Sequence, residues 1–210
     1  MANAREALLD AALAALAHRP WSAVRMADLA TSARVSRQTL YNEFGSKEGL
    51  ARALVRREAD AYLQGVRHLL AAPAPPERKL VALAEWIVAR AAVRPILRAL
   101  LTGAWDERLP RPRPVRPGAR LAPVPAQRRA DAGPPAPGEL VAEAAAAAGE
   151  WAAGCELAVR IALSHVVAPV LPVPPQCAEP ESWSPMTPTI TRLMETILSV
   201  ETTSPRKTMP

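Results

Sequence analysis

Residues 24–50 read VRMADLATSARVSRQTLYNEFGSKEGL. The apolar spacing predicts two short helices, over residues 26–32 and 37–43, joined by a three-residue turn. Ser36 is a suitable N-cap for the second helix, and Ser46 caps a longer helix that follows. Helices this short are not stable alone, because nucleating a helix is costly. They must therefore pack on each other and on a neighbouring helix.

The neighbouring helix is expected over residues 3–17, where Leu9, Leu13 and Leu16 recur at helical spacing. Asn3 is placed to cap this helix. Two short helices braced by a third form the geometry of a helix-turn-helix, whose second helix enters the major groove of DNA. We therefore predict a DNA-binding unit at the start of the chain.

The side chains of residues 37–43 suit contact with a duplex, since only Leu40 is apolar. Arginine pairs with guanine through two hydrogen bonds, and glutamine pairs with adenine in the same way, which indicates Arg37 and Gln38. A solvated helix face is the alternative interpretation. Side chains able to donate to DNA phosphates are Ser36, Thr39, Tyr41 and Lys47.

The same segment resembles the TetR family, which commonly has an Ile/Leu-Ala pair, an Ala-Gly-Val-Ser turn, a Thr-Leu-Tyr run and a Phe-x-Ser-Lys-Glu-x-Leu run. The matching residues here are Leu29-Ala30, Ala33-Arg-Val-Ser36, Thr39-Leu40-Tyr41 and Phe44-Gly-Ser-Lys-Glu-Gly-Leu50. Their order and spacing agree throughout, and the resemblance extends over about residues 5–65.

Two positions depart from the family pattern. Arg34 replaces the usual glycine of the turn, where a positive φ would cost about 1 kcal/mol in a residue with a side chain. Arg25 stands where a threonine or serine often caps the first short helix, so that cap is lost. The Arg25 side chain could still reach a phosphate.

The resemblance implies an all-α fold with an N-terminal three-helix DNA-binding domain and a larger helical domain for ligand binding and dimerisation. It makes Arg37, Gln38 and Tyr41 the main candidates for base contacts, and Asn42 could contact a base or a phosphate. The implied phosphate contacts are Ser36, Thr39, Tyr41 and Lys47. The mechanism that the resemblance implies is a population shift. The bound ligand favours a domain arrangement in which the two recognition helices no longer match the spacing of the DNA grooves.

We expect residues 1–48 to form the DNA-binding domain, residues 49–200 the second domain, and residues 201–210 a flexible tail. The predicted helices beyond the first domain cover residues 46–70, 77–94, 95–102, 139–148, 150–168 and 189–200. In the family the last two helices pair with those of a second subunit, which here implies a homodimer through 150–168 and 189–200.

Residues 104–138 are rich in proline and arginine, and few of them could be buried. A long solvated loop with one short helix near 124–132 is predicted. The alternative is an arm that contacts DNA phosphates. A second proline-rich loop covers residues 169–188.

Three tryptophans of the second domain, Trp86, Trp105 and Trp151, suit an apolar ligand pocket. Plain core packing is the alternative for each. His165 either orients a ligand or satisfies a buried backbone carbonyl. The effector is therefore expected to be a small and largely apolar molecule of unknown identity.

The formal charge of +6 and the pI of about 10.1 do not by themselves support DNA binding. Residues 1–50 carry six basic and five acidic side chains, a sum of about +1. The excess lies in residues 108–129, which hold seven arginines. Location therefore matters more than the total charge.

The sequence has no glycine-rich phosphate loop, nucleophile elbow or metal-ligand cluster, so neither an enzyme nor a cofactor or metal site is expected. The cysteines Cys155 and Cys177 are expected to be buried thiols. Without a signal-peptide pattern or a membrane span, we expect a cytoplasmic protein. The predicted function is a ligand-responsive repressor that binds an inverted-repeat operator as a dimer. The alternative is a DNA-binding protein without an effector, which acts constitutively or through a protein partner and uses loop 104–138 as its interaction element.

Overall fold

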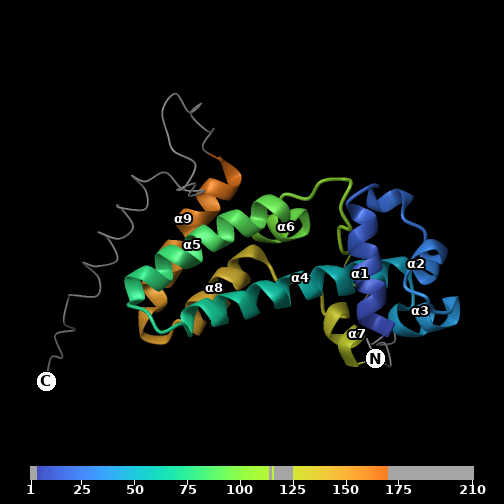
Figure 1. Cartoon of the computed structure of the whole chain (residues 1–210), viewed down its shortest axis with the longest axis horizontal. Helices are drawn as coiled ribbons and strands as arrows, with labels where there is room; N and C mark the ends of the chain where they lie inside the picture. Colours follow the sequence, from blue (N-terminus) through green and yellow to red (C-terminus); the bar gives the residue numbers. More distant parts are fainter. Residues whose placement is uncertain (1–3, 114, 116–124, 170–210) are drawn as a thin grey trace, which may run out of the picture. The chain divides into compact units, whose positions relative to one another are not determined.

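The computed structural model describes residues 4–113, 115 and 125–169, and all regular structure in these ranges is helical (Figure 1). The expected all-α fold is thus confirmed. The predicted helix 189–200, the tail 201–210, Asn3 and Cys177 lie outside the described residues. The elements are α1 (Ala4–Leu16), η1 (Trp21–Ala23), α2 (Met26–Ser32), α3 (Arg37–Phe44), α4 (Lys47–Leu70), α5 (Pro76–Val93), α6 (Pro95–Thr102), α7 (Pro125–Asp131), α8 (Pro137–Ala147), η2 (Gly149–Trp151) and α9 (Ala152–Val167).

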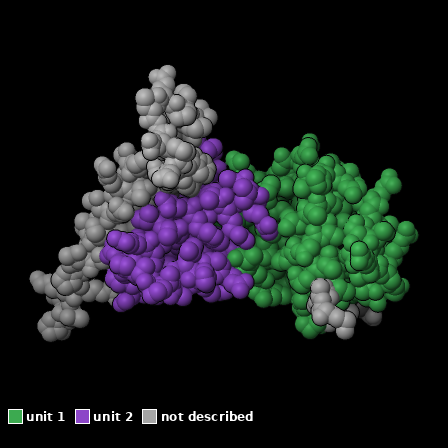
Figure 2. Space-filling model, viewed as in Figure 1, with its two compact units in different colours: residues 1–61, 95–136 green, residues 62–94, 137–210 purple. Residues whose placement is uncertain are grey.

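The chain forms two compact units, coloured green and purple in Figure 2. Unit 1 comprises Met1–Ala61 and Pro95–Ala136, and unit 2 comprises Tyr62–Arg94 and Pro137–Pro210. Helix α4 therefore contributes its first part to unit 1 and its last part to unit 2. These units are defined by compactness, whereas the boundary that we predict after residue 48 separates the DNA-binding domain from the ligand-binding and dimerisation domain. That boundary stays a prediction.

The core of unit 1 joins the first four helices. Helices α1, α2 and α3 pack on one another, and each buries its apolar face because the other two cover it. The hydroxyl of Ser46 accepts a hydrogen bond from the backbone N–H of Gly49 (3.0 Å), which caps α4. The buried side chains include Leu8, Leu9, Ala12, Leu29, Leu40, Phe44, Leu50 and Leu54.

Within unit 1, a buried polar network joins helix α7 to α1 and α4. The guanidinium of Arg5 donates to the side-chain oxygen of Gln127 (3.1 Å), and the Gln127 amide donates to the backbone carbonyl of Gly49 (3.1 Å). Gln127 also donates to Asp131 (2.8 Å), which forms an ion pair with Arg52 (2.8 Å). The sequence correctly predicts a short helix near 124–132, but it does not predict that Gln127 is only 1% exposed.

The core of unit 2 is built around α5, α8 and α9, with α9 packed on the other two. Tyr62 stacks on Trp86, with ring centroids 6.0 Å apart and an interplanar angle of 21°. A side chain at Gly65 would overlap the Trp86 ring, so glycine is what permits this close approach. None of the helices within the described ranges combines the length and the apolarity that crossing a membrane requires.

Cys155 is fully buried, and its thiol donates a weak hydrogen bond to the carbonyl of Ala144 (3.4 Å). Burial raises the pKa of Cys155 to about 11, because the thiolate is poorly solvated there. The expected buried thiol is confirmed at this position.

The Cys155 thiol should therefore resist modification by Ellman's reagent at pH 8 in the folded protein, because the thiolate is the reacting species. A Cys177→Ser variant isolates the signal of Cys155. We expect reaction within minutes in 6 M guanidinium and at least a hundredfold slower reaction without denaturant. Equal rates in both conditions would show that Cys155 is accessible.

Candidate nucleic-acid interface

Helix α3 presents a polar face to solvent. Arg37, Gln38 and Asn42 are exposed, and Tyr41 is 48% exposed. Leu40 and Phe44 lie on the opposite face, are buried, and hold α3 against α1 and α2. The side chains with the greatest capacity for base contacts are therefore accessible.

Hydrogen bonds between side chains organise this face before any partner binds. The hydroxyl of Ser36 accepts from the backbone N–H of Thr39 (3.0 Å), so the predicted N-cap is confirmed. The Ser36 and Thr39 hydroxyls are also within hydrogen-bond distance of each other (2.8 Å). The Gln38 amide donates to the side-chain oxygen of Asn42 (2.7 Å), one turn later. Gln38, a predicted base contact, and Asn42, predicted to contact a base or a phosphate, thus hold each other in position.

The turn before α3 contains a strained residue. Arg34 has a φ of 56°, and among the described residues it is the one non-glycine with a positive φ. The positive φ considered for this turn is thus present although the residue is not glycine. The backbone N–H of Val35 donates to the carbonyl of Ala30 (3.0 Å), which fixes the turn despite this strain.

Replacing Arg34 with glycine should raise the free energy of unfolding by about 1 kcal/mol, because glycine adopts a positive φ without steric cost. The midpoint of thermal unfolding should rise by roughly 2–4 °C for a chain of this size. Gly45→Ala is a matched control of opposite sign, since Gly45 has a φ of 70° and open space around its α-carbon. A less stable Arg34→Gly variant would contradict the assigned strain.

Lys47 and Arg25, two predicted phosphate contacts, differ in their surroundings. Arg25 is exposed at the start of α2 and makes no side-chain capping hydrogen bond, so the expected loss of the cap is confirmed. The Lys47 ammonium donates to the carbonyl of Ser22 (3.2 Å) and lies 5.3 Å from the ring centroid of Trp21. Desolvation lowers the pKa of Lys47, although the charge of Glu48 acts in the opposite direction.

The four predicted ligand-binding residues are divided between the units. Trp105 belongs to unit 1 and lines a hollow of about 810 Å³. In unit 2, Trp86 packs on Tyr62, and Trp151 lines a hollow of only about 60 Å³. His165 is buried with its Nδ1 2.9 Å from the carbonyl of Ile161, which matches the alternative of a satisfied carbonyl.

Comparison with known proteins finds relatives of the N-terminal helices. Residues 8–54 match the family described as "Bacterial regulatory proteins, tetR family". The HTH-type transcriptional regulator AlkX of Mycobacterium tuberculosis (strain ATCC 25618 / H37Rv) is 47% identical over 62 residues, 30% of this chain and 29% of that protein. The N-terminal helices of the chain are thus those of the TetR family.

The TetR-family fold is also found beyond the first helices. The TetR family repressor AlkX from Dietzia sp. strain DQ12-45-1b, described as implicated in biodegradation of n-alkanes, has a similar crystal structure, with a TM-score of 0.50 and 21% sequence identity. The match covers 95% of this chain and 97% of that one. Both of these AlkX proteins are named as transcriptional regulators.

Sequence reasoning missed the charged residue that supports α3. Arg5 is 7% exposed, donates to the backbone carbonyl of Glu43 (3.1 Å), and lies 4.6 Å from the ring centroid of Phe44. One pattern could have indicated this, because Arg5 shares a helical face with the buried residues Leu8, Leu9 and Ala12. A charge in such a stripe must find a partner when the stripe is buried.

Proposed function

We propose that this protein is a TetR-family transcriptional repressor that binds an inverted-repeat operator as a homodimer in the cytoplasm, and that a small, largely apolar molecule releases it. The observation that carries the DNA-binding part is the polar, exposed face of α3 above the buried Leu40 and Phe44. That geometry leaves the helix free to enter a major groove.

The proposed roles follow from chemistry and exposure. Arg37 would bond guanine, Gln38 would bond adenine, and Tyr41 would contact a base edge or a phosphate. Asn42 would take either role, and its hydrogen bond with Gln38 makes the two contacts interdependent. The proposed phosphate contacts are Arg25, Ser36, Thr39 and Lys47.

The proposed dimer uses the segments 150–168 and 189–200. Within the chain, α9 already buries its small residues Gly154, Ala158 and Ala162. Its half-exposed Leu157, Ile161 and Leu163 and its exposed Val167 are among the apolar side chains available to a second subunit. A two-fold dimer presents two recognition helices, which is why an inverted repeat is the expected operator.

The proposal is tested by selecting bound sequences from a random duplex pool with the full chain. An inverted repeat with two half-sites about one helical turn apart is the expected result. A pool that shows no enrichment at any salt concentration would overturn the DNA-binding proposal. Enrichment of a single half-site would overturn the dimer alone.

Substitutions at Arg37 and Lys47 should separate base recognition from phosphate contact. Arg37→Ala is expected to weaken binding to the selected sequence by about 1–3 kcal/mol and to relax the preference for guanine. Lys47→Ala should weaken binding evenly across sequences and reduce the slope of affinity against salt. Titrations of the selected and a scrambled duplex at several salt concentrations measure both effects. Identical profiles for the two variants would contradict the assigned roles.

A further inference from the structure

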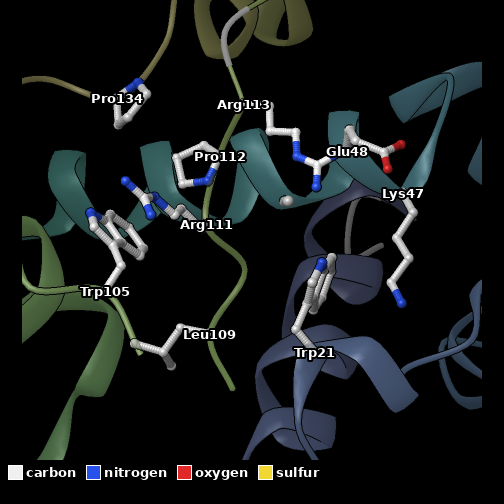
Figure 3. A pocket seen from close by; sticks show the side chains of 10 residues that line it. Trp21, Lys47, Glu48, Trp105, Leu109, Arg111, Pro112, Arg113 and Pro134 are labelled. Atoms are coloured by element: carbon white, nitrogen blue, oxygen red, sulfur yellow. The ribbon is translucent and has the colours of Figure 1, made fainter. Parts of the chain in front are cut away.

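A hollow in unit 1 lies beside Lys47 and carries features that the DNA-binding role does not use (Figure 3). Its volume of about 810 Å³ falls within the usual range for small-molecule sites. In the view of Figure 3, Trp105 and Arg111 lie on one side, and Trp21 and Lys47 lie on the other. The hollow is thus bordered by η1, the start of α4 and the segment that follows α6.

Hydrogen bonding holds the walls together. The backbone N–H of Trp21 donates to the carbonyl of Arg108 (2.8 Å), which ties the segment after α6 to η1. Asp106 accepts from the backbone N–H of Arg108 (2.6 Å) and shapes the turn between Trp105 and Leu109. The pocket is therefore built by tertiary contacts between segments far apart in the sequence.

The charge of the lining favours an anion. Three cationic side chains, Lys47, Arg111 and Arg113, face one carboxylate, Glu48. Within the described ranges, no ion pair joins Arg111 or Arg113 to a carboxylate. Guanidinium groups bind carboxylates through two parallel hydrogen bonds, which gives the site a preference for a planar anion.

The remaining lining favours an aromatic body. Trp21 and Trp105 offer indole rings, and Leu109 and Pro112 add apolar surface. Aromatic rings pack favourably against indoles and are amply accommodated by this volume. The Lys47 ammonium is partly desolvated against Trp21, so a bound anion would offset a cost that the free protein already bears.

We propose that this pocket binds a small aromatic carboxylate, with Arg111 and its cationic neighbours Lys47 and Arg113 attracting the anionic group and the Trp105 indole packing on the ring. Of the four predicted ligand-binding residues the pocket takes only Trp105, because Trp86, Trp151 and His165 belong to unit 2. Since Lys47 borders the pocket and is also a proposed phosphate contact, the bound anion competes with DNA for its charge. This second consequence rests on the proposed function, whereas binding to the free protein does not.

Binding is tested on the full chain without DNA by calorimetric titration of 2-naphthoate. The neutral 2-naphthalenemethanol has the same rings without the charge, so it should bind at least tenfold more weakly. Saturable binding of one naphthoate per chain is the expected result. Absence of saturable heat, or equal binding of the acid and the alcohol, would overturn the proposal.

Paired variants locate the site. Arg111→Gln with Arg113→Gln should weaken naphthoate binding at least tenfold, and Trp105→Leu should weaken it several-fold. A control variant with Arg67→Gln and Arg78→Gln removes the same charge from exposed positions of unit 2 and should bind as the unaltered chain does. Loss of binding in the control, or unchanged binding in the pocket variant, assigns naphthoate to a different place and overturns the proposal.

The competition is tested with the duplex selected above. Saturating naphthoate should weaken DNA binding several-fold, and the pocket variant should abolish this response. If naphthoate binds without changing DNA affinity, the competition through Lys47 is wrong. If naphthoate fails to bind while the pocket variant loses affinity for DNA, Arg111 and Arg113 serve as an arm that contacts phosphates instead.

Discussion

Replacing Arg5 with methionine is expected to lower the free energy of unfolding by about 3 kcal/mol, the range found when one partner of a buried polar network is removed. Methionine keeps the apolar contact with Phe44 but donates no hydrogen bond. The side-chain oxygen of Gln127 and the backbone carbonyl of Glu43 both lose a donor. Gln127 is buried, so it cannot recover that bond from bulk water.

Urea denaturation followed by circular dichroism measures this loss. Arg5 also pairs with the Glu43 carboxylate (3.4 Å). Arg19→Met is the matched control, because Arg19 pairs with the Asp28 carboxylate (3.2 Å) while the Arg19 and Asp28 side chains are 44% and 46% exposed. Exposed pairs contribute about 0–1 kcal/mol, so the control should change stability little. Equal effects of the two variants would mean that the Arg5 network contributes no more than a surface ion pair.

The Arg5 variant should also weaken DNA binding, because Arg5 donates to the carbonyl of Glu43 in α3 and packs on Phe44 in the same helix. The affinity of the variant should fall for every duplex, and its preference among bases should stay the same. This distinguishes a positioning residue from a base contact such as the one proposed for Arg37. A changed base preference in the Arg5 variant would contradict that role.

Gly49→Ala is expected to cost about 3 kcal/mol of stability, at the upper end of what overpacking costs. A β-carbon at Gly49 would overlap the carbonyl oxygen of Phe44, which is backbone and cannot rotate away. Relief requires α4 to move from the end of α3, and that movement breaks the hydrogen bond from Gln127 to Gly49. The same shift would disturb the first turn of α4, where Lys47 lies.

Gly138→Ala in the first turn of α8 is the control, because a β-carbon there meets nothing within 4 Å. Alanine at such a position is neutral or stabilises the protein by about 0.4–1 kcal/mol, because it lowers the conformational entropy of the unfolded chain. Urea denaturation of both variants, with DNA binding as a second measurement, tests the contrast. A Gly49→Ala variant as stable as the unaltered chain would show that the α3–α4 junction tolerates a side chain.

Most helices could be predicted because their signals are local. Proline and serine at the starts of helices, glycine after Phe44, and the spacing of leucines all act within a few residues. The structure accordingly has α2 at Met26–Ser32, as expected, and α3 one residue longer than expected. The family motif is equally local, which explains why 27 consecutive residues suffice to indicate the TetR family.

A ligand pocket is formed by residues that are distant in the sequence. Local signals of the kind that predict helices therefore could not predict which residues line it. The sequence placed Trp86, Trp105 and Trp151 in one domain by order along the chain. The structure assigns Trp105 to unit 1 because the segment after α6 hydrogen-bonds to η1. No periodic pattern reports such a contact between residues 21 and 108.

The sequence by itself determined the helical fold, the caps around α3 and the polar character of its outer face. Only the tertiary structure decided that Arg5 pairs with Gln127, 122 residues away, and that Trp21 and Trp105 border one pocket. The physical reason is range. Helix formation and capping are governed by residues one or two helical turns apart. These pairs form only once the chain has folded back, because burial then deprives their polar groups of hydrogen bonds to water.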